Sequence, residues 1–262
     1  MAYGRGTLAK KVALVDPILG PLTSDRLTRD VEVYQREKGH RFSSDDIVTA
    51  YIAANAMPNA QHVLDLGCGL GSVLLHLAWS LPDATLLGIE AQAISFELLR
   101  RNLERSGFAN RVRIVHGDIR DARVFDNVRP PFDLVTGTPP YFPPSSALNA
   151  EDEQRAFARV EYRGGVEAYV KAGLSQLAAN GRLVLCADTR SADRVETAAR
   201  AGSAEVESRC DVIPRAGRPP LFSVWTVAKS HVATQQIGAL MLRDSEGNQT
   251  QAAQRLREFS GF

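Results

Sequence analysis

The fold of this chain is decided by the stretch Val63-Leu64-Asp65-Leu66-Gly67-Cys68-Gly69-Leu70-Gly71-Ser72. A short apolar run, typical of a buried strand, leads into glycines at three alternate positions, and residues 72–81 then have helical apolar spacing. Glycines at such a turn let the backbone reverse tightly and approach a ligand closely. We therefore interpret the stretch as a strand, a ligand-binding turn and the start of a helix.

Strand and helix patterns alternate on both sides of this turn. Strands are expected at 63–66, 85–90, 112–116, 132–136, 182–187, 204–213 and 221–228, and helices at 45–56, 72–81, 93–106, 165–179, 191–201 and 250–259. Such alternation favours an α/β fold with a doubly wound, mostly parallel sheet of seven strands. A Pro/Gly turn without a helix joins the last two strands, which predicts an antiparallel strand near the C-terminal edge. Asn180-Gly181 is expected to cap the helix at 165–179.

The 262 residues are interpreted as one large domain with two appendages. Residues 1–44 form an N-terminal extension rich in basic side chains, a candidate cap over the substrate; residues 45–229 form the main domain; residues 230–262 form a polar tail with one helix. The 31 Lys and Arg residues nearly balance 30 Asp and Glu, so the net charge is +1. This excludes a uniformly basic nucleic-acid-binding protein, although a local basic patch is compatible with it.

Three widely spaced cysteines indicate reduced thiols, and the five histidines lack metal-ligand spacing, so neither a disulfide framework nor a metal site is expected. The sequence has no apolar run long enough for a membrane helix and no signal-peptide pattern at its N-terminus. A cytoplasmic location is therefore expected, and the oligomeric state is left open.

Two further acidic positions follow predicted strands. Glu90 ends the second strand, where a carboxylate can accept hydrogen bonds from both hydroxyls of a ribose; the alternative is a solvated acid. Asp118 and Ile119 follow the third strand, where they could contact an exocyclic adenine amine and the ring face; the alternative is a helix N-cap. A dinucleotide fingerprint would need glycine at Ser72, and the sequence contains no P-loop.

Asp65 and the three glycines, followed by Glu90 and Asp118, resemble the class I S-adenosylmethionine-dependent methyltransferases over residues 45–229. The resemblance implies a Rossmann-like fold with S-adenosylmethionine as cofactor. The glycine loop would lie under the methionine part, Asp65 would serve its amino acid end, and Glu90 would bind the ribose. The implied cofactor-binding residues are Asp65, Gly67, Cys68, Gly69, Gly71, Glu90, Ala91, Asp118 and Ile119.

A proline-rich loop follows the fourth strand. Thr138-Pro139-Pro140-Tyr141 resembles the N-P-P-Y motif of amino-methylating enzymes, with Thr138 where Asn is usual. In such a loop the first side chain and the following carbonyl each accept one N–H of a poorly nucleophilic nitrogen and direct its lone pair. The prolines restrain the carbonyl, and Tyr141 offers a stacking face. These four residues are the candidate catalytic residues; a structural proline-rich turn is the alternative.

The chain resembles two subfamilies, which imply different substrates. Residues 41–45, the Tyr141-Phe142 pair and residues 242–250 resemble bacterial tRNA adenine-N6 methyltransferases. Residues 161–166 with Tyr169 resemble release-factor glutamine methyltransferases, whose helical N-terminal domain 44 residues cannot supply. We therefore expect an enzyme that methylates adenine N6 in structured RNA such as tRNA. The alternatives are a protein glutamine (N5-type) or small-molecule methyltransferase, and a methyl-donor-binding interaction module without amine chemistry, which Thr138 motivates.

Four residues are the candidate substrate-binding positions of this chain. Phe142 extends the aromatic pair, Arg41 precedes the first core helix, and Arg215 and Arg218 adjoin a Pro-Pro turn that suits phosphate contact. Ordinary surface arginines are the alternative interpretation for the last two.

Overall fold

A computed structural model describes residues 14–128, 131–146, 152–231 and 233–262. The strands are β1 (Leu14–Asp16), β2 (Gly20–Arg26), β3 (Glu32–Arg36), β4 (His62–Leu66), β5 (Thr85–Glu90), β6 (Val112–His116), β7 (Phe132–Gly137), β8 (Leu177–Ala187), β9 (Glu205–Ile213), β10 (Phe222–Ala228) and β11 (Gln236–Met241). The helices are α1 (Ser44–Ala56), α2 (Ser72–Ser80), α3 (Ala93–Ser106), α4 (Glu153–Arg159), α5 (Val166–Gln176), α6 (Ala192–Ala201) and α7 (Gln251–Phe259).

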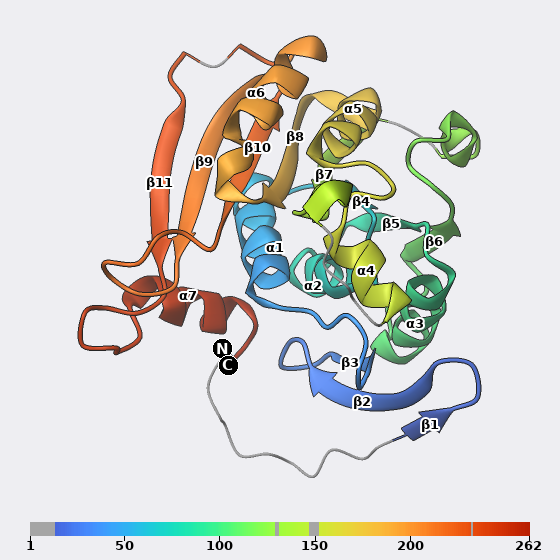
Figure 1. Ribbon diagram of the computed structural model, residues 1–262. Coiled ribbons are helices and arrows are strands. Elements are labelled where there is room, and N and C mark those ends of the chain that lie inside the picture. Colours follow the sequence, from blue (N-terminus) through green and yellow to red (C-terminus); the bar gives the residue numbers. More distant parts are fainter. Residues whose placement is uncertain (1–13, 129–130, 147–151, 232) are drawn as a thin grey trace.

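Within these residues the main sheet has the order β11-β9-β10-β8-β7-β4-β5-β6 (Figure 1). The pairs from β8 through β6 are parallel, whereas β10 is antiparallel to both β8 and β9. The predicted α/β class with an antiparallel strand near the C-terminal edge is therefore confirmed. An eighth strand, β11, adds to the seven expected and runs parallel to β9. It was missed because four of its six residues are exposed, so it has no clear burial pattern.

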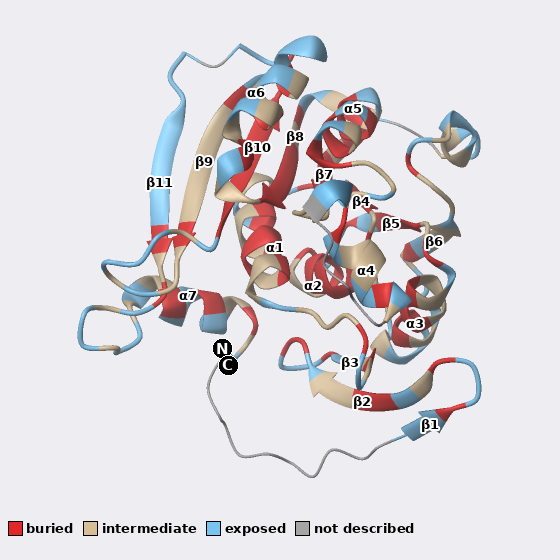
Figure 2. Ribbon diagram, viewed as in Figure 1, coloured by how far each residue is buried: buried red, intermediate tan, exposed pale blue. Residues whose placement is uncertain are grey.

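Helices cover both faces of the main sheet. Neighbouring residues of a strand point to opposite faces, so an apolar strand presents side chains for packing on both. Leu134 packs with α1, α2 and α3, whereas Val135 packs with α5 and α6. Val184 and Leu185 of β8 repeat this division. The central strands are accordingly buried on both sides, while the β11 edge is largely exposed (Figure 2). The continuous apolar runs in the sequence therefore correspond to strands that are buried on both faces of the sheet.

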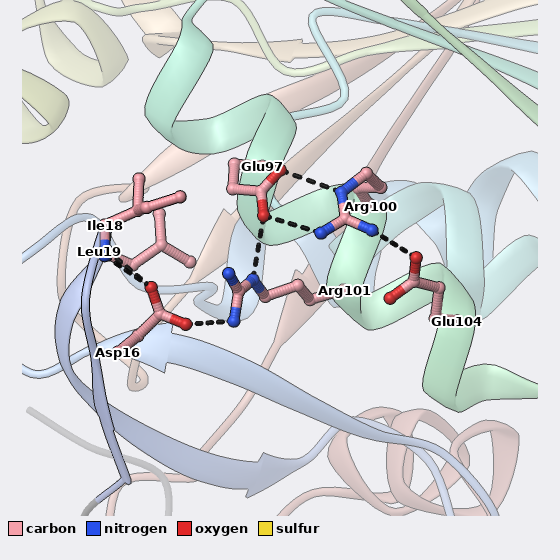
Figure 3. Close-up of polar contacts among 7 residues, drawn as sticks. All are labelled: Asp16, Ile18, Leu19, Glu97, Arg100, Arg101 and Glu104. Carbon is pink, nitrogen blue, oxygen red and sulfur yellow. Dashed lines mark hydrogen bonds and ion pairs between the residues drawn. The ribbon is translucent and has the colours of Figure 1, made fainter.

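The N-terminal extension contains a small antiparallel sheet of β1, β2 and β3, where no regular structure was expected. Figure 1 shows this sheet beside α3. Asn102 of α3 accepts a hydrogen bond from the Tyr34 N–H at 2.7 Å and donates to the Tyr34 carbonyl at 3.1 Å. Asp16 also pairs with Arg101 of α3 (Figure 3). These contacts join residues far apart in the sequence, so no local sequence pattern predicts them. The basic residues Lys10 and Lys11 lie outside the described residues.

Two further differences concern segments next to the site. Helix α5 ends at Gln176, three residues before the expected end, and β8 begins at Leu177. Gly181 does not cap the helix, because it is a residue of β8, and an added Cβ there would be 2.8 Å from the Asp133 carbonyl oxygen of β7. Helix α4 was not predicted at all. In the described part of the chain, no helix is long and apolar enough to cross a membrane.

Candidate active site

The candidate site is a pocket at the carboxyl ends of β4, β5, β6 and β7, where parallel strands bring their following loops together. Of the predicted residues, the pocket is lined by Gly67, Cys68, Gly69, Glu90, Ala91, Asp118, Ile119, Thr138 and Pro140. Cofactor-binding and catalytic candidates that are far apart in the sequence therefore share one cavity.

The glycine loop depends on backbone conformations that other residues rarely adopt. Gly67, Gly69 and Gly71 have φ values of +60°, +57° and +96°. An added Cβ at Gly67 would lie 2.2 Å from the Tyr169 hydroxyl oxygen, whereas one at Gly69 would have no heavy atom of the described residues within 4 Å. The loop thus packs on one side against Tyr169 and leaves Gly69 open, which suits a ligand lying directly on the backbone.

Glu90 fixes this loop from the neighbouring strand. Its Oε2 accepts a hydrogen bond from the Gly69 N–H at 2.8 Å, and its Oε1 accepts one from the Gln92 N–H at 2.6 Å. The side chain is buried, and burial raises the pKa of Glu90. Each carboxylate oxygen has a second lone pair, so the group still has acceptor capacity for two ribose hydroxyls.

Two buried carboxyl groups adjoin the site, of which Asp46 lines the pocket, whereas the predicted residues Asp65 and Gly71 are outside its lining. Asp65 accepts a hydrogen bond from Thr136 Oγ1 at 2.8 Å, but its other oxygen, Oδ2, has no partner among the described residues. Asp46, in the first turn of α1, lines the pocket and accepts a hydrogen bond from the Ser43 N–H at 2.9 Å. Burial raises the pKa of Asp65 to about 7, and burial with repulsion from Asp45 raises that of Asp46 to about 8.

These two carboxyl groups and the open backbone at Gly69 fit S-adenosylmethionine, whose ammonium and sulfonium groups are cationic. A buried carboxylate without a partner is costly, and a ligand cation would remove that cost. Sequence reasoning missed Asp46, because it was interpreted only as part of a helix start; nothing local indicates that it faces the glycine loop.

The predicted adenine contacts also line the pocket. Asp118 accepts hydrogen bonds from Arg120, including one from Nη2 at 2.7 Å, and this partner lowers the pKa of Asp118. Ile119 and Ala91 also line the pocket, and Ile119 offers an apolar face. The charged Asp118 keeps lone pairs for an amine donor.

The proline-rich loop brings only part of its motif into the pocket. Thr138 and Pro140 line it, whereas Pro139 and Tyr141 are outside its lining. The Tyr141 hydroxyl donates to Asp45 Oδ2 at 3.0 Å and lies 3.2 Å from Cys186 Sγ, so it points between α1 and β8. The stacking role of Tyr141 stays a prediction.

Phe142 and the three arginine candidates are also outside the pocket lining. The Phe142 N–H donates to the Arg159 carbonyl at 3.0 Å. Arg41 pairs with Asp25 of β2 at 2.6 Å. Arg215 donates to the Ser245 carbonyl and, like Arg218, lies in the β9–β10 connection. Substrate contact by these residues stays a prediction.

Several pocket residues were not predicted as site residues. They include His40, Asp46, Gln92, Gln154, Phe157, Arg163 and Tyr169. Most come from the N-terminal extension, α4 and the residues after it, segments whose positions depend on tertiary contacts; Tyr169 was noted only within a subfamily resemblance. Among the described residues, no cluster of His, Cys, Asp and Glu is placed to hold a metal ion.

Comparison with known proteins shows the family of the chain. Residues 63–160 match the family described as "Methyltransferase domain". A tRNA1(Val) (adenine(37)-N6)-methyltransferase of Yersinia pestis is 31% identical over 194 residues, which cover 72% of this chain and 75% of that protein. The chain therefore belongs to the same methyltransferase family as this relative. A Porphyromonas gingivalis tRNA1(Val) (adenine(37)-N6)-methyltransferase is 38% identical over 136 residues, and the match spans about half of each protein, 51% in both cases.

Other similarities are shorter or more distant. A release factor glutamine methyltransferase of Chlorobaculum tepidum is 32% identical over 108 residues, covering 40% of this chain and 37% of that protein. A solved structure of a predicted O-methyltransferase from Agrobacterium tumefaciens has a TM-score of 0.64 at 19% identity, covering 82% of this chain and 96% of that one. This likeness concerns the fold alone. S-adenosylmethionine is the methyl donor of the class I methyltransferases to which the chain belongs.

Proposed function

We propose that this chain transfers the methyl group of S-adenosylmethionine to the N6 amine of an adenine in tRNA, acting in the cytoplasm. The observation that carries the proposal is the shared pocket: Thr138 and Pro140 of the acceptor loop line the same cavity as Gly69 and Glu90 of the donor site. Methyl transfer needs donor and acceptor in one cavity, because alignment supplies much of the rate gain. Family membership and the named substrates of the relatives support this choice.

S-adenosylmethionine supplies an electrophilic methyl group on a sulfonium. In the proposal Glu90 binds the ribose, while Asp65 and Asp46 bind the ammonium. Thr138 Oγ1 and the Pro139 carbonyl each accept one N–H of the adenine amine, which turns the nitrogen lone pair toward the methyl carbon. The nitrogen forms the new N–C bond, the electrons of the C–S bond return to sulfur, and the amine loses one proton to water.

A protein glutamine is the second candidate, favoured by the 32% identity to a release factor glutamine methyltransferase. A glutamine amide is also a planar nitrogen with two N–H groups, so the acceptor loop alone does not exclude it. The match covers only 37% of that relative, compared with 75% of the Yersinia pestis tRNA enzyme. We therefore rank the tRNA substrate first.

The test is methyl transfer from labelled S-adenosylmethionine to total tRNA and, separately, to total protein. We expect label in tRNA, and digestion to nucleosides should yield N6-methyladenosine. Label in protein would select the glutamine candidate. Binding of S-adenosylhomocysteine without labelling of either fraction would select a small-molecule substrate or a methyl-donor-binding module. The Thr138→Val variant tests whether the labelling depends on the Thr138 hydroxyl, because it keeps the shape of the side chain and removes the hydroxyl.

A further inference from the structure

Helix α4 carries two exposed arginines that have no acidic partner in the part of the chain that the structure describes. Arg155 and Arg159 are one helical turn apart and therefore lie on the same face of the helix. Neither makes an ion pair among the described residues, whereas nearby Arg36, Arg120 and Arg194 each pair with a carboxylate. Two like charges at this spacing repel one another. An anionic partner from outside the chain would relieve that repulsion.

The opposite face of α4 belongs to the pocket. Gln154, Phe157 and Ala158 line it, at the i, i+3 and i+4 positions of one helix face. The side chain of Gln154 is buried, donates to Ser95 Oγ at 3.2 Å and accepts from the His40 N–H at 3.2 Å. One face of this short helix thus closes the cofactor pocket while the other presents its arginines to solvent.

Helix α4 is held from two sides. Arg36 of β3 pairs with Asp152, the N-cap of α4, at 2.8 Å. Gln92 Nε2 donates to the Glu153 carbonyl at 3.3 Å. The N-terminal sheet and the segment before α3 therefore fix the helix in place. A binding face that is already ordered loses little conformational entropy when a partner docks.

The same helix is joined to the acceptor loop. The Phe142 N–H donates to the Arg159 carbonyl at 3.0 Å, and the Glu161 N–H donates to the Phe142 carbonyl at 2.9 Å. Phe142 is four residues beyond Thr138, which lines the pocket. The backbone of Arg159 is therefore tied directly to the loop that would hold the methyl acceptor.

Charge is divided between the inside of the pocket and its rim. Asp46, Glu90 and Asp118 line the interior. Arg163 also lines the pocket, with its guanidinium 4.3 Å from the centre of the Phe157 ring. Arg155 and Arg159 extend this positive charge outward. A cationic cofactor suits the interior, and a substrate whose reacting base is neutral but whose backbone is anionic suits the rim.

We propose that Arg155 and Arg159 bind the phosphates that flank the target adenosine while its base enters the pocket. This inference rests on the proposed function, because it names how the RNA of that reaction is held. Arginine suits the role, since its planar fork binds phosphate oxygens in pairs and remains charged at all relevant pH values. The partner is thus an unpaired or flipped-out nucleotide in structured RNA.

The test is equilibrium binding of purified tRNA to the full chain over a range of KCl concentrations. The variant is Arg155→Gln with Arg159→Gln. Its charge-matched control is Arg123→Gln with Arg200→Gln, two exposed arginines outside the pocket lining. We expect tRNA affinity at low salt to fall about tenfold or more in the variant. The slope of log K against log[KCl] should become shallower by about 0.7 per lost phosphate contact in single-stranded RNA.

Two further measurements separate a phosphate contact from a structural role. S-adenosylhomocysteine affinity should be unchanged in the variant, because neither arginine lines the pocket. Arg155→Lys with Arg159→Lys should restore most of the salt slope, since lysine keeps the charge. Loss of S-adenosylhomocysteine affinity in the Gln variant would overturn the inference by showing that α4 is disturbed.

The inference and the proposed function can fail separately. If the wild-type chain binds and methylates tRNA but the Gln variant keeps the slope and affinity of the control pair, the phosphate contact is wrong and the function stands. If the wild-type chain does not bind tRNA at low salt, or methylates a protein instead, the proposed function fails and the inference fails with it.

Discussion

Glu90 accepts a hydrogen bond from the backbone N–H of Gly69 at 2.8 Å, so the last residue of β5 holds the glycine loop that follows β4. The two residues are 21 positions apart in the sequence. Glu90 therefore shapes the loop and, in the proposed function, also binds the ligand.

Replacing Glu90 with Ala should weaken S-adenosylhomocysteine binding by about 1.5–3 kcal/mol, roughly 10- to 150-fold, the usual scale for hydrogen bonds to a charged group. Isothermal titration calorimetry measures this change. Glu104→Ala, on the exposed side of α3, is the control and should bind like the wild type. Equal affinity of the Glu90→Ala variant and the wild type would refute the ribose assignment.

The Thr138→Val variant should lower the rate of methyl transfer about ten- to a hundredfold, because one transition-state hydrogen bond is lost. Single-turnover transfer to tRNA measures the rate. S-adenosylhomocysteine affinity should change little, since position 138 faces the acceptor in the proposed arrangement. Thr138→Asn should keep or raise the rate with an amine substrate. A wild-type rate for Thr138→Val would mean that Thr138 is only a turn residue.

The ligand-free chain should lose stability as the pH rises from about 4 to about 8. The folded pKa values of Asp65 and Asp46, about 7 and about 8, lie above the unfolded value of 3.8. Stability from these groups is therefore complete below pH 3.8 and lost as the pH rises through the folded values. Asp65 alone should contribute a loss on the order of 3 kcal/mol between pH 4 and pH 7.

Urea unfolding at several pH values tests this expectation. The Asp46→Asn variant cannot ionise at position 46, so its unfolding free energy should decline less steeply between pH 6 and pH 8. S-adenosylhomocysteine should release protons when it binds near pH 7, because its ammonium favours the ionised carboxylates; calorimetry in buffers of different ionisation enthalpy measures this release. A wild-type pH profile for Asp46→Asn would argue against a buried, protonated Asp46.

The Asp16→Asn variant should have a lower melting temperature than the wild type at neutral pH. Asp16 accepts hydrogen bonds from the Leu19 and Ile18 N–H groups and pairs with Arg101 (Figure 3). These hydrogen bonds and the Arg101 charge lower the pKa of Asp16, so its stabilising effect is present above pH 3.8 and lost as the pH falls through the folded pKa. The difference between variant and wild type, followed by circular dichroism, should therefore shrink below pH 4. A constant difference would point to packing instead.

Much of the main domain could be predicted from local patterns. The Asp65–Gly71 loop, the strand that ends at Glu90 and the helices on either side have signals within about ten residues, and the structure has each element within a few residues of its expected range. Apolar periodicity and glycine position carry this information because they reflect burial and backbone conformation directly. Strand β11 and helix α4 were not predicted, since their exposed and polar residues carry no comparable signal.

The sequence by itself therefore determined the alternating α/β order, the glycine turn and the residue types of a methyl-donor site. Only the tertiary structure decided that Asp46 lines the same pocket as Gly69 and that Tyr141 points to Asp45. It also decided that one face of α4 lines the pocket while Arg155 and Arg159, on its other face, are exposed. The physical reason is that local conformation follows from neighbouring residues, whereas these contacts join segments whose distance is set by packing of the whole core.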